Sequence, residues 1–199
     1  MITPKELEDK MQVHIRLHSG LEPNRSYLGM SQVAKCARQA YDRFVSGADT
    51  SDFHHRMCYV GYMYEQDVLR RLREMNIARL DRRELVASFD DRLRGHIDGI
   101  TFWNDLLEIK SVTASKFELV DKQARVLHEH NDQVQLYMRY GSWNYTWVVY
   151  VNRETFEHRV IRVRYDEHKA IELENKARQI LRAIDARERP KCECGYCEE

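Results

Sequence analysis

In the middle of the chain the spacing of apolar residues changes from a helical repeat to short apolar runs, and this change limits the folds that the chain can adopt. Three short apolar runs follow one another over residues 84–89, 92–103 and 105–112. The pairs Asp90-Asp91 and Asn104-Asp105 interrupt them, and such pairs favour tight turns between antiparallel strands. The runs therefore predict a meander of three antiparallel strands.

Segments with helical spacing lie on both sides of this predicted meander. Helices are expected over residues 4–17, 31–44 (with Ser31 as N-cap), 59–75, 131–140 and 167–187, the last one stopped by Pro190. A β-prone run at 145–152 precedes an alternating run at 157–165, which predicts a further antiparallel pair. This order of elements predicts an α/β fold with a mixed central sheet and helices on its faces.

The composition indicates a folded chain without a general positive field. Of its 199 residues 43% are hydrophobic, which is enough for one domain with a core. Lys and Arg together number 32, as do Asp and Glu, so a nucleic-acid partner would be held by a local basic groove or by metal ions. Arg38, Arg43, Arg70 and Arg71 are candidates for such a groove, although an ordinary charged surface explains each of them singly.

The cysteines point to a metal in a reducing compartment. The first 20 residues contain no apolar core of signal-peptide length, and no run approaches a membrane span. We therefore expect a cytoplasmic protein with no membrane partner, in which clustered thiols bind metal more often than they form disulfides. Cys192, Cys194 and Cys197 lie within six positions. From the residues alone, these thiols and a fourth ligand elsewhere would form a zinc site.

Asp98, Glu108 and Lys110 form the candidate catalytic group. Strand alternation puts Glu108 and Lys110 on one face, and Asp98 lies ten residues before Glu108 across a tight turn. Two carboxylates about 4 Å apart repel by roughly 4 kcal/mol at an effective dielectric constant near 20, and one lysine does not neutralise both. A divalent cation such as Mg²⁺ or Mn²⁺ would remove this repulsion. For the triplet E-I-K alone, an exposed Glu–Lys ion pair is the simpler interpretation.

Three further polar residues are expected to face the same site. Glu65 projects from the apolar stripe of the 59–75 helix, where a carboxylate is costly unless it is paired or binds metal. Gln133 and Tyr137 are four residues apart and share a helix face, from which an amide and a phenol can orient water or hold a phosphate. Taken singly, each of the three also fits the polar edge of an amphipathic helix.

Several motifs in this order resemble those of the PD-(D/E)XK nucleases of the RecB-type branch. They are GHIDG (95–99), LEIK (107–110) and QVQLY (133–137), preceded by SQVAKCARQAYDRF (31–44), which resembles the early Ser…Cys-x-Arg-x-x-Tyr helix of that branch. The likeness is strongest to the iron–sulfur exonucleases associated with CRISPR adaptation and to the nuclease domain of AddB. It spans about residues 30–197.

The resemblance implies a single nuclease domain over residues 1–199, with a catalytic core at 59–165. Asp98, Glu108, the carbonyl of Ile109 and Glu65 would then bind Mg²⁺ or Mn²⁺. His54 and His55 are rivals for the position given to Glu65, but the predicted helix places them before its start.

The same resemblance assigns catalytic roles. Lys110 would position or activate the attacking water and stabilise the phosphate charge, while Gln133 and Tyr137 would help to position the water and the DNA. The implied reaction is metal-dependent hydrolysis of DNA phosphodiester bonds, by an exonuclease on single-stranded DNA or overhangs. A CRISPR-adaptation or recombination protein is the kind of partner implied. The alternatives are a non-catalytic DNA-binding or assembly subunit that keeps the nuclease fold, and an endonuclease stapled by zinc. A restriction-type endonuclease is disfavoured, because the chain leaves no room for a separate recognition domain.

The resemblance also supplies the fourth thiolate. Cys36 would join Cys192, Cys194 and Cys197 around a 4Fe–4S cluster, with residues 30–45 and 190–199 forming the cluster-binding part. The C-x-C spacing is tighter than in relatives, so zinc stays an alternative. Cys58 is expected to be a buried small apolar residue. Tyr140, Trp143 and Trp147 are expected to pack in the core rather than to stack on bases.

Overall fold

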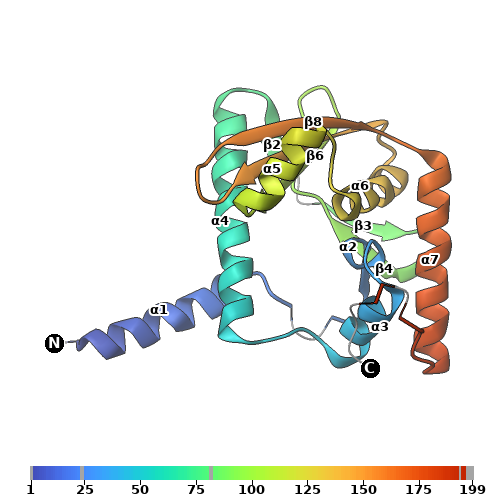
Figure 1. Cartoon of the computed structure of the whole chain (residues 1–199), viewed down its shortest axis with the longest axis horizontal. Coiled ribbons are helices and arrows are strands. Elements are labelled where there is room, and N and C mark those ends of the chain that lie inside the picture. The colour runs from blue at the N-terminus through green and yellow to red at the C-terminus, as the bar shows by residue number, and fades with distance from the viewer. Residues whose placement is uncertain (1, 23–24, 81–82, 193, 196–199) are drawn as a thin grey trace.

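The computed structural model describes residues 2–22, 25–80, 83–192 and 194–195 (Figure 1). A five-stranded mixed sheet has the strand order β2-β5-β6-β7-β8. Its strands are β2 (Ala78–Leu80), β5 (Gly99–Thr101), β6 (Leu106–Val112), β7 (Tyr145–Asn152) and β8 (His158–Arg164). β6 and β7 are parallel, and the other neighbours are antiparallel. The predicted pairing of the last two runs is confirmed as the β7–β8 hairpin.

A second sheet of three strands lies beside the first, in the order β1-β4-β3. Its strands are β1 (Leu28–Gly29), β3 (Glu84–Ala87) and β4 (Asp90–His96). The prediction of one three-stranded meander is therefore wrong. The run at 92–103 is split: β4 pairs with β3, whereas β5 pairs with β6 in the larger sheet. The chain crosses between the sheets at Ile97 and Asp98.

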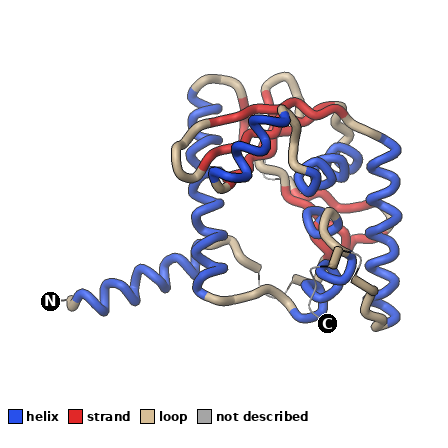
Figure 2. The backbone as a smooth tube through the Cα atoms, in the orientation of Figure 1, coloured by secondary structure: helices blue, strands red, loops and turns tan. Residues whose placement is uncertain are grey.

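Seven helices surround the strands in the described part of the chain. They are α1 (Pro4–His18), α2 (Met30–Val33), α3 (Ala37–Ser46), α4 (Asp52–Glu74), α5 (Ala114–Gln123), α6 (His128–Gly141) and α7 (Glu167–Ala186). Figure 2 shows the two long helices α4 and α7 on opposite sides of the strands. Together the helices and sheets give the α/β architecture that the sequence predicts.

Some helix boundaries differ from the prediction. The segment 31–44 is two helices, and Gly29 and Cys36, rather than Ser31, are the N-cap residues of α2 and α3. α4 begins seven residues earlier than expected, where the hydroxyl of Ser51 accepts a hydrogen bond from the amide of His54. α7 ends before Pro190 is reached, at Arg187 in the left-handed conformation.

The core has two parts, one on each face of the larger sheet. Val68 and Leu69 of α4 pack with Leu107, Ile109 and Val149 on one face. The larger part, between the sheets and helices α6 and α7, buries residues that include Leu136, Tyr150 and Leu173. Trp143 is buried in it with Tyr140 packed alongside, and Trp147 packs against the smaller part, as the core interpretation of these aromatics predicts.

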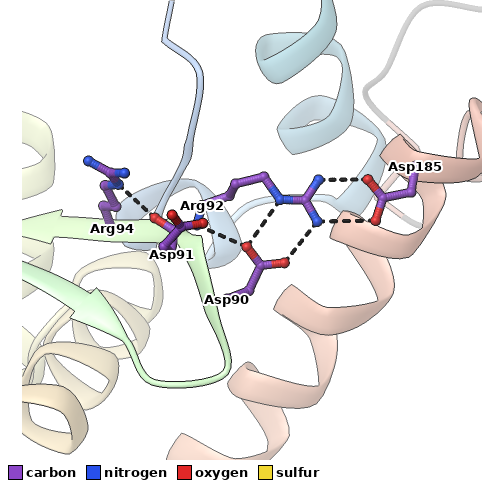
Figure 3. A network of polar contacts seen from close by, with 5 residues as sticks. All are labelled: Asp90, Asp91, Arg92, Arg94 and Asp185. Carbon is purple, nitrogen blue, oxygen red and sulfur yellow. Dashed lines mark hydrogen bonds and ion pairs between the residues drawn. The ribbon is translucent and has the colours of Figure 1, made fainter.

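An arginine ties α7 to the smaller sheet. Figure 3 shows Arg92 of β4 between two carboxylates, Asp90 on its own strand and Asp185 near the end of α7. Its guanidinium nitrogens lie 2.8 Å from Asp90 Oδ2 and 2.6 Å from Asp185 Oδ1. Such paired contacts fix both distance and orientation. They hold the helix that leads to the C-terminal cysteines against the sheet.

Among the helices that the structure describes, none is both long enough and apolar enough to cross a lipid bilayer.

Candidate active site

The predicted Glu–Lys pair lies in the middle of β6, a central strand of the larger sheet. Glu108 is 1% exposed, and its Oε1 atom lies 2.6 Å from Nζ of Lys110. The two side chains lie on the same face of the strand, as the alternation predicts. Because Glu108 is buried, the pair is not the ordinary exposed ion pair that the triplet alone suggests.

Asp98 reaches this pair from the crossover between the sheets. The pairing of β5 with β6 ends at Gly99 opposite Leu107, so the register places Asp98 next to Glu108. The amide of Ile109 donates a hydrogen bond to Asp98 Oδ2 over 2.7 Å. The Asp98 carboxylate thus takes the place of the backbone carbonyl that would accept this bond if β5 were longer. The N–H and C=O groups of one strand residue point to the same side. The carbonyl oxygen of Ile109 therefore faces the Asp98 side of β6.

α6 contributes Gln133 and Tyr137, which are both buried. Nε2 of Gln133 donates to Oε1 of Glu108 over 2.8 Å and to the hydroxyl of Tyr137 over 2.9 Å. The Tyr137 ring lies against β4 at Gly95, where a Cβ atom would sit 2.4 Å from Cε1 of the ring. The helix face predicted from the four-residue spacing thus points at Glu108.

Glu65 lies on α4, and its charge acts on both Asp98 and Lys110. Its rivals His54 and His55 lie inside the first turn of α4, not before the helix. At 1.5 Å per residue, they are about 15 Å from Glu65 along the helix axis. The structure therefore brings Glu65, rather than either histidine, toward the carboxylate group.

Burial and like charges favour protonation of these carboxyl groups. Burial raises the pKa of Asp98 well above its ordinary value, and the charges of Glu108 and Glu65 raise it further. Burial also raises the pKa of Glu108, although Lys110 and Gln133 act against it. Burial would lower the pKa of Lys110, but the carboxylates of Glu108 and Asp98 outweigh it and the pKa is raised. The group holds more acidic side chains than its single lysine can neutralise.

One oxygen of the group lacks a protein partner. Oε2 of Glu108 is buried and makes no hydrogen bond with any residue that the structure describes. Such an oxygen is costly in a protein interior. A divalent cation would satisfy it together with an oxygen of Asp98 and the carbonyl of Ile109. Carboxylate and carbonyl oxygens are ligands of Mg²⁺ and Mn²⁺, so the donor set fits the predicted metal.

His130, which the sequence did not single out, lies beside this group. Tyr150 of β7 is in register with Lys110, and its hydroxyl lies 2.9 Å from Nδ1 of His130. The amide of Leu127 donates to the same hydroxyl, which leaves the hydroxyl proton for the imidazole. Burial and the charge of Lys110 lower the pKa of His130 to about 4. Its partner is 20 residues away on a strand, so the spacing along α6 carries no signal of this contact.

Three cysteines form a separate candidate metal centre. The sulfur atoms of Cys36, Cys192 and Cys194 all lie within 4.8 Å of one another, and those of Cys192 and Cys194 are 3.5 Å apart. Cys197, the predicted fourth ligand, lies outside the described residues. Cys58 is half-buried rather than buried, so that prediction is wrong in degree.

Polar contacts hold the segment after α7 against α3. Nε of Arg38 donates to the carbonyl oxygen of Pro190 over 3.0 Å. The guanidinium of Arg189 makes two hydrogen bonds of 2.8 Å to the carboxylate of Asp42. The break between α2 and α3 leaves Cys36 at the start of α3, beside the segment that these contacts fix. Residues 156 positions apart are thereby brought together.

Comparison with known proteins supports the fold. No protein-family model matches the chain, and no curated protein sequence matches it. The structure of an alkaline exonuclease (LHK-Exo) from Laribacter hongkongensis has a TM-score of 0.61 at 16% identity, over 83% of this chain and 91% of that one. LHK-Exo in complex with dAMP gives the same TM-score at 15% identity and the same coverage. The structure of SSO0001 has a TM-score of 0.60 at 18% identity, over 90% of this chain and 87% of that one.

At these identities the likeness concerns the fold alone. The chain shares a mixed α/β fold with an exonuclease, and this confirms the coarse part of the predicted architecture. It does not identify the iron–sulfur branch of the family that the motifs resemble.

Proposed function

We propose that the chain is a metal-dependent deoxyribonuclease that hydrolyses phosphodiester bonds. The observation that carries this proposal is Glu108, whose Oε1 meets Lys110 and Gln133 while its buried Oε2 has no partner among the described residues. A purely structural ion pair would not leave that oxygen unsatisfied beside a second acid, Asp98. The fold shared with LHK-Exo, an exonuclease that has been solved with dAMP, supports a nucleic-acid substrate.

The proposed metal ligands are the carboxylates of Asp98, Glu108 and Glu65 and the carbonyl oxygen of Ile109. When bound, Mg²⁺ or Mn²⁺ would lower the pKa of water and neutralise phosphate charge. The amide of Ile109 already orients the carboxylate of Asp98. Two of the proposed metal ligands, this carboxylate and the carbonyl oxygen of Ile109, are therefore held in place before any cation binds.

The remaining residues orient the substrate and the acids. Lys110 stays protonated because the neighbouring carboxylates raise its pKa, so it serves as a cation for the phosphate and a donor to the attacking water. Gln133 fixes the orientation of Glu108 and is itself in contact with the hydroxyl of Tyr137. In this proposal Gln133 acts on the reaction by orienting Glu108, and Tyr137 acts by orienting Gln133.

On the basis of the motif resemblance, we propose for the cysteine centre a 4Fe–4S cluster bound by Cys36, Cys192, Cys194 and Cys197. Zinc is the second candidate, because sulfurs in a tetrahedral site with bonds of about 2.3 Å lie about 3.8 Å apart. The distance of 3.5 Å between two of these sulfurs is near that value. A visible absorption spectrum of anaerobically purified protein, with metal analysis, decides between them, since zinc thiolates are colourless.

The nuclease proposal is tested with end-labelled single-stranded and double-stranded DNA in Mg²⁺, Mn²⁺ or EDTA. We expect cleavage only with metal, faster release of mononucleotides than of internal fragments, and a preference for single strands or overhangs. Lys110→Ala should reduce the rate by about 10³-fold. Lys122→Ala is the matched control, because this exposed lysine contacts only Glu118 among the ion pairs of the described chain, and it should cleave like the wild type.

Two results would contradict the proposal. Equal cleavage by Lys110→Ala and Lys122→Ala would remove the candidate group from the reaction. DNA binding without any metal-dependent cleavage would instead indicate the non-catalytic subunit.

A further inference from the structure

The four arginines considered for a basic groove differ in what they contact. Arg38 holds the segment after α7, and Arg70 and Arg71 both pair with Asp67 on their own helix. These three are occupied with structural contacts. Arg43 of α3 is half-buried and makes no hydrogen bond or ion pair within residues 2–22, 25–80, 83–192 and 194–195.

Arg43 of α3 lies near three other hydrogen-bond donors, which are Gln32 of α2, Lys35 in the break between α2 and α3, and Gln39 of α3. All four line one cavity of about 480 Å³, here called the Arg43 cavity. Asp49 and His54, the latter at the start of α4, also line it. Two amides, two cations and one carboxylate thus line a single hollow.

The acidic groups around the Arg43 cavity have other partners. The carboxylate of Asp49 accepts hydrogen bonds from the amide and the hydroxyl of Ser51, at 2.8 and 3.0 Å. Glu22 accepts from Nε of Arg25 over 2.8 Å. Burial and then the charge of Arg25 lower the pKa of Arg43, while the charges of Cys58 and Glu22 act in the opposite sense. A phosphate beside the guanidinium would offset the cost of its burial.

α2, which lines part of the Arg43 cavity, connects it to the candidate catalytic group. This helix packs against α6, the helix that carries two of the site residues, and Figure 1 shows α2 below α6. Lys35 acts electrostatically on His130, and His130 lies in the field of Lys110. Through Lys35, the Arg43 cavity is therefore within electrostatic range of His130, which lies beside the candidate catalytic group.

We propose that the Arg43 cavity holds the phosphodiester backbone of one nucleic-acid strand whose end lies at the catalytic group. This rests on the proposed nuclease function and adds the path of the strand. The N–H donors and cations of the lining match phosphate oxygens. Its volume lies in the range of a pocket for one drug-sized ligand, which is the size of a nucleotide. A cavity of this volume has room for one nucleotide of a single strand.

Binding is measured by fluorescence anisotropy with a fluorescein-labelled oligonucleotide of twelve thymidines, in EDTA and over a range of KCl. We expect Arg43→Ala to lower the affinity about tenfold and to reduce the slope of log K against log[KCl] by about 0.7, the loss of one phosphate contact on a single strand. Gln39→Glu adds a negative charge at an exposed position and should weaken binding without affecting folding. Arg70→Ala is the matched control and should bind like the wild type.

Hydrolysis separates this inference from the function on which it rests. Thymidine 5′-p-nitrophenyl phosphate has a single phosphodiester, so when this group lies at the catalytic site no second phosphate is left to enter the Arg43 cavity. With Mn²⁺, Arg43→Ala should hydrolyse it within about twofold of the wild type while losing about tenfold in kcat/KM on the oligonucleotide. A wild type that hydrolyses neither substrate would overturn the nuclease function. A wild type that hydrolyses both, with Arg43→Ala and Gln39→Glu that bind and cleave normally, would overturn the cavity proposal alone.

Discussion

At the scale of single residues, Asp98 is held where its ionised form is unfavourable. Burial and the charges of Glu108 and Glu65 raise its pKa, whereas a metal ligand must be ionised. The carboxylate pair that we propose to bind a cation therefore lowers the stability of the metal-free protein. The raised pKa of Asp98 therefore predicts in which direction the stability of the metal-free protein changes with pH.

In EDTA, Asp98→Asn should be more stable than the wild type, and its advantage should grow as the pH rises. Below the unfolded-state pKa of about 3.9 Asp98 is protonated in both states, so the two proteins should match. Above it the unfolded chain ionises while the folded one retains the proton, so the wild type loses stability with rising pH. We expect a difference in Tm of about 2–4 °C near pH 8, for about 1 kcal/mol.

The measurement is thermal unfolding of both proteins in EDTA from pH 4 to pH 8. His130, with a pKa of about 4, makes the folded state more stable as the pH rises, which is the opposite of the effect of Asp98. Its contribution is the same in both proteins, so the difference between their Tm values reports on Asp98 alone. Asp91→Asn, at an exposed aspartate of β4, is the control and should show no such trend. A Tm difference that stays constant or shrinks with pH would contradict the raised pKa. With Mn²⁺, Asp98→Asn should gain little stability and cleave no DNA.

At the scale of elements, the site depends on how closely α6 approaches β4. Gly95→Ala would place a Cβ atom 2.4 Å from the Tyr137 ring and 2.9 Å from Sδ of Met30. We expect a loss of about 1–3 kcal/mol in the free energy of unfolding from overpacking, and a drop in cleavage rate of about tenfold or more, because the Tyr137 ring must move. Chemical denaturation and the nuclease assay measure the two effects.

Gly61→Ala provides the matched control for this substitution. Gly61 lies inside α4, and a Cβ atom there would meet its nearest neighbour, Oγ of Ser111, at 4.0 Å. Alanine is favoured over glycine in a helix by about 1 kcal/mol, so this variant should be more stable and remain active. If both variants lost activity equally, the close contact of Tyr137 with β4 would not be the cause.

The elements also show what local patterns can predict. The alternation in 105–112 and the four-residue spacing of Gln133 and Tyr137 each predict the correct face, because one strand or one helix decides it. The split of 92–103 could not be predicted in this way, because the two halves have the same apolar character and their different partners decide the sheet.

Breaks and short elements were missed for related reasons. The chain leaves the helical path before Cys36 without a proline or glycine, so packing rather than local preference causes the break. β2 is three residues long, too short for a visible alternation. α5 buries only Phe117 and Val120 among its described residues, which leaves a weak helical period. Tertiary contacts, absent from any local window, decide all three.

At the scale of the whole molecule, the proposed cysteine centre would close the chain on itself. Cys36 and Cys192 are 156 residues apart, and almost the entire fold lies between them. By analogy with a disulfide that closes a loop of about 100 residues, a metal bridge would stabilise the fold by about 4–5 kcal/mol. The contacts of Arg92 with Asp185 and of Arg189 with Asp42 hold the same end of the chain in place. The centre would therefore complete an arrangement that protein contacts begin.

Cys194→Ser should consequently act far from its own position. We expect colourless or insoluble protein, a Tm lower by about 10 °C or more for a loss of about 4–5 kcal/mol, and weaker DNA binding, because α3 carries both Cys36 and Arg43. Cys58→Ser is the control, since this half-buried thiol lies outside the three-cysteine group and its loss should leave colour and DNA binding unchanged. Absorption, thermal unfolding and anisotropy measure the three effects. A soluble Cys194→Ser with full activity would show that the centre does not hold the fold together.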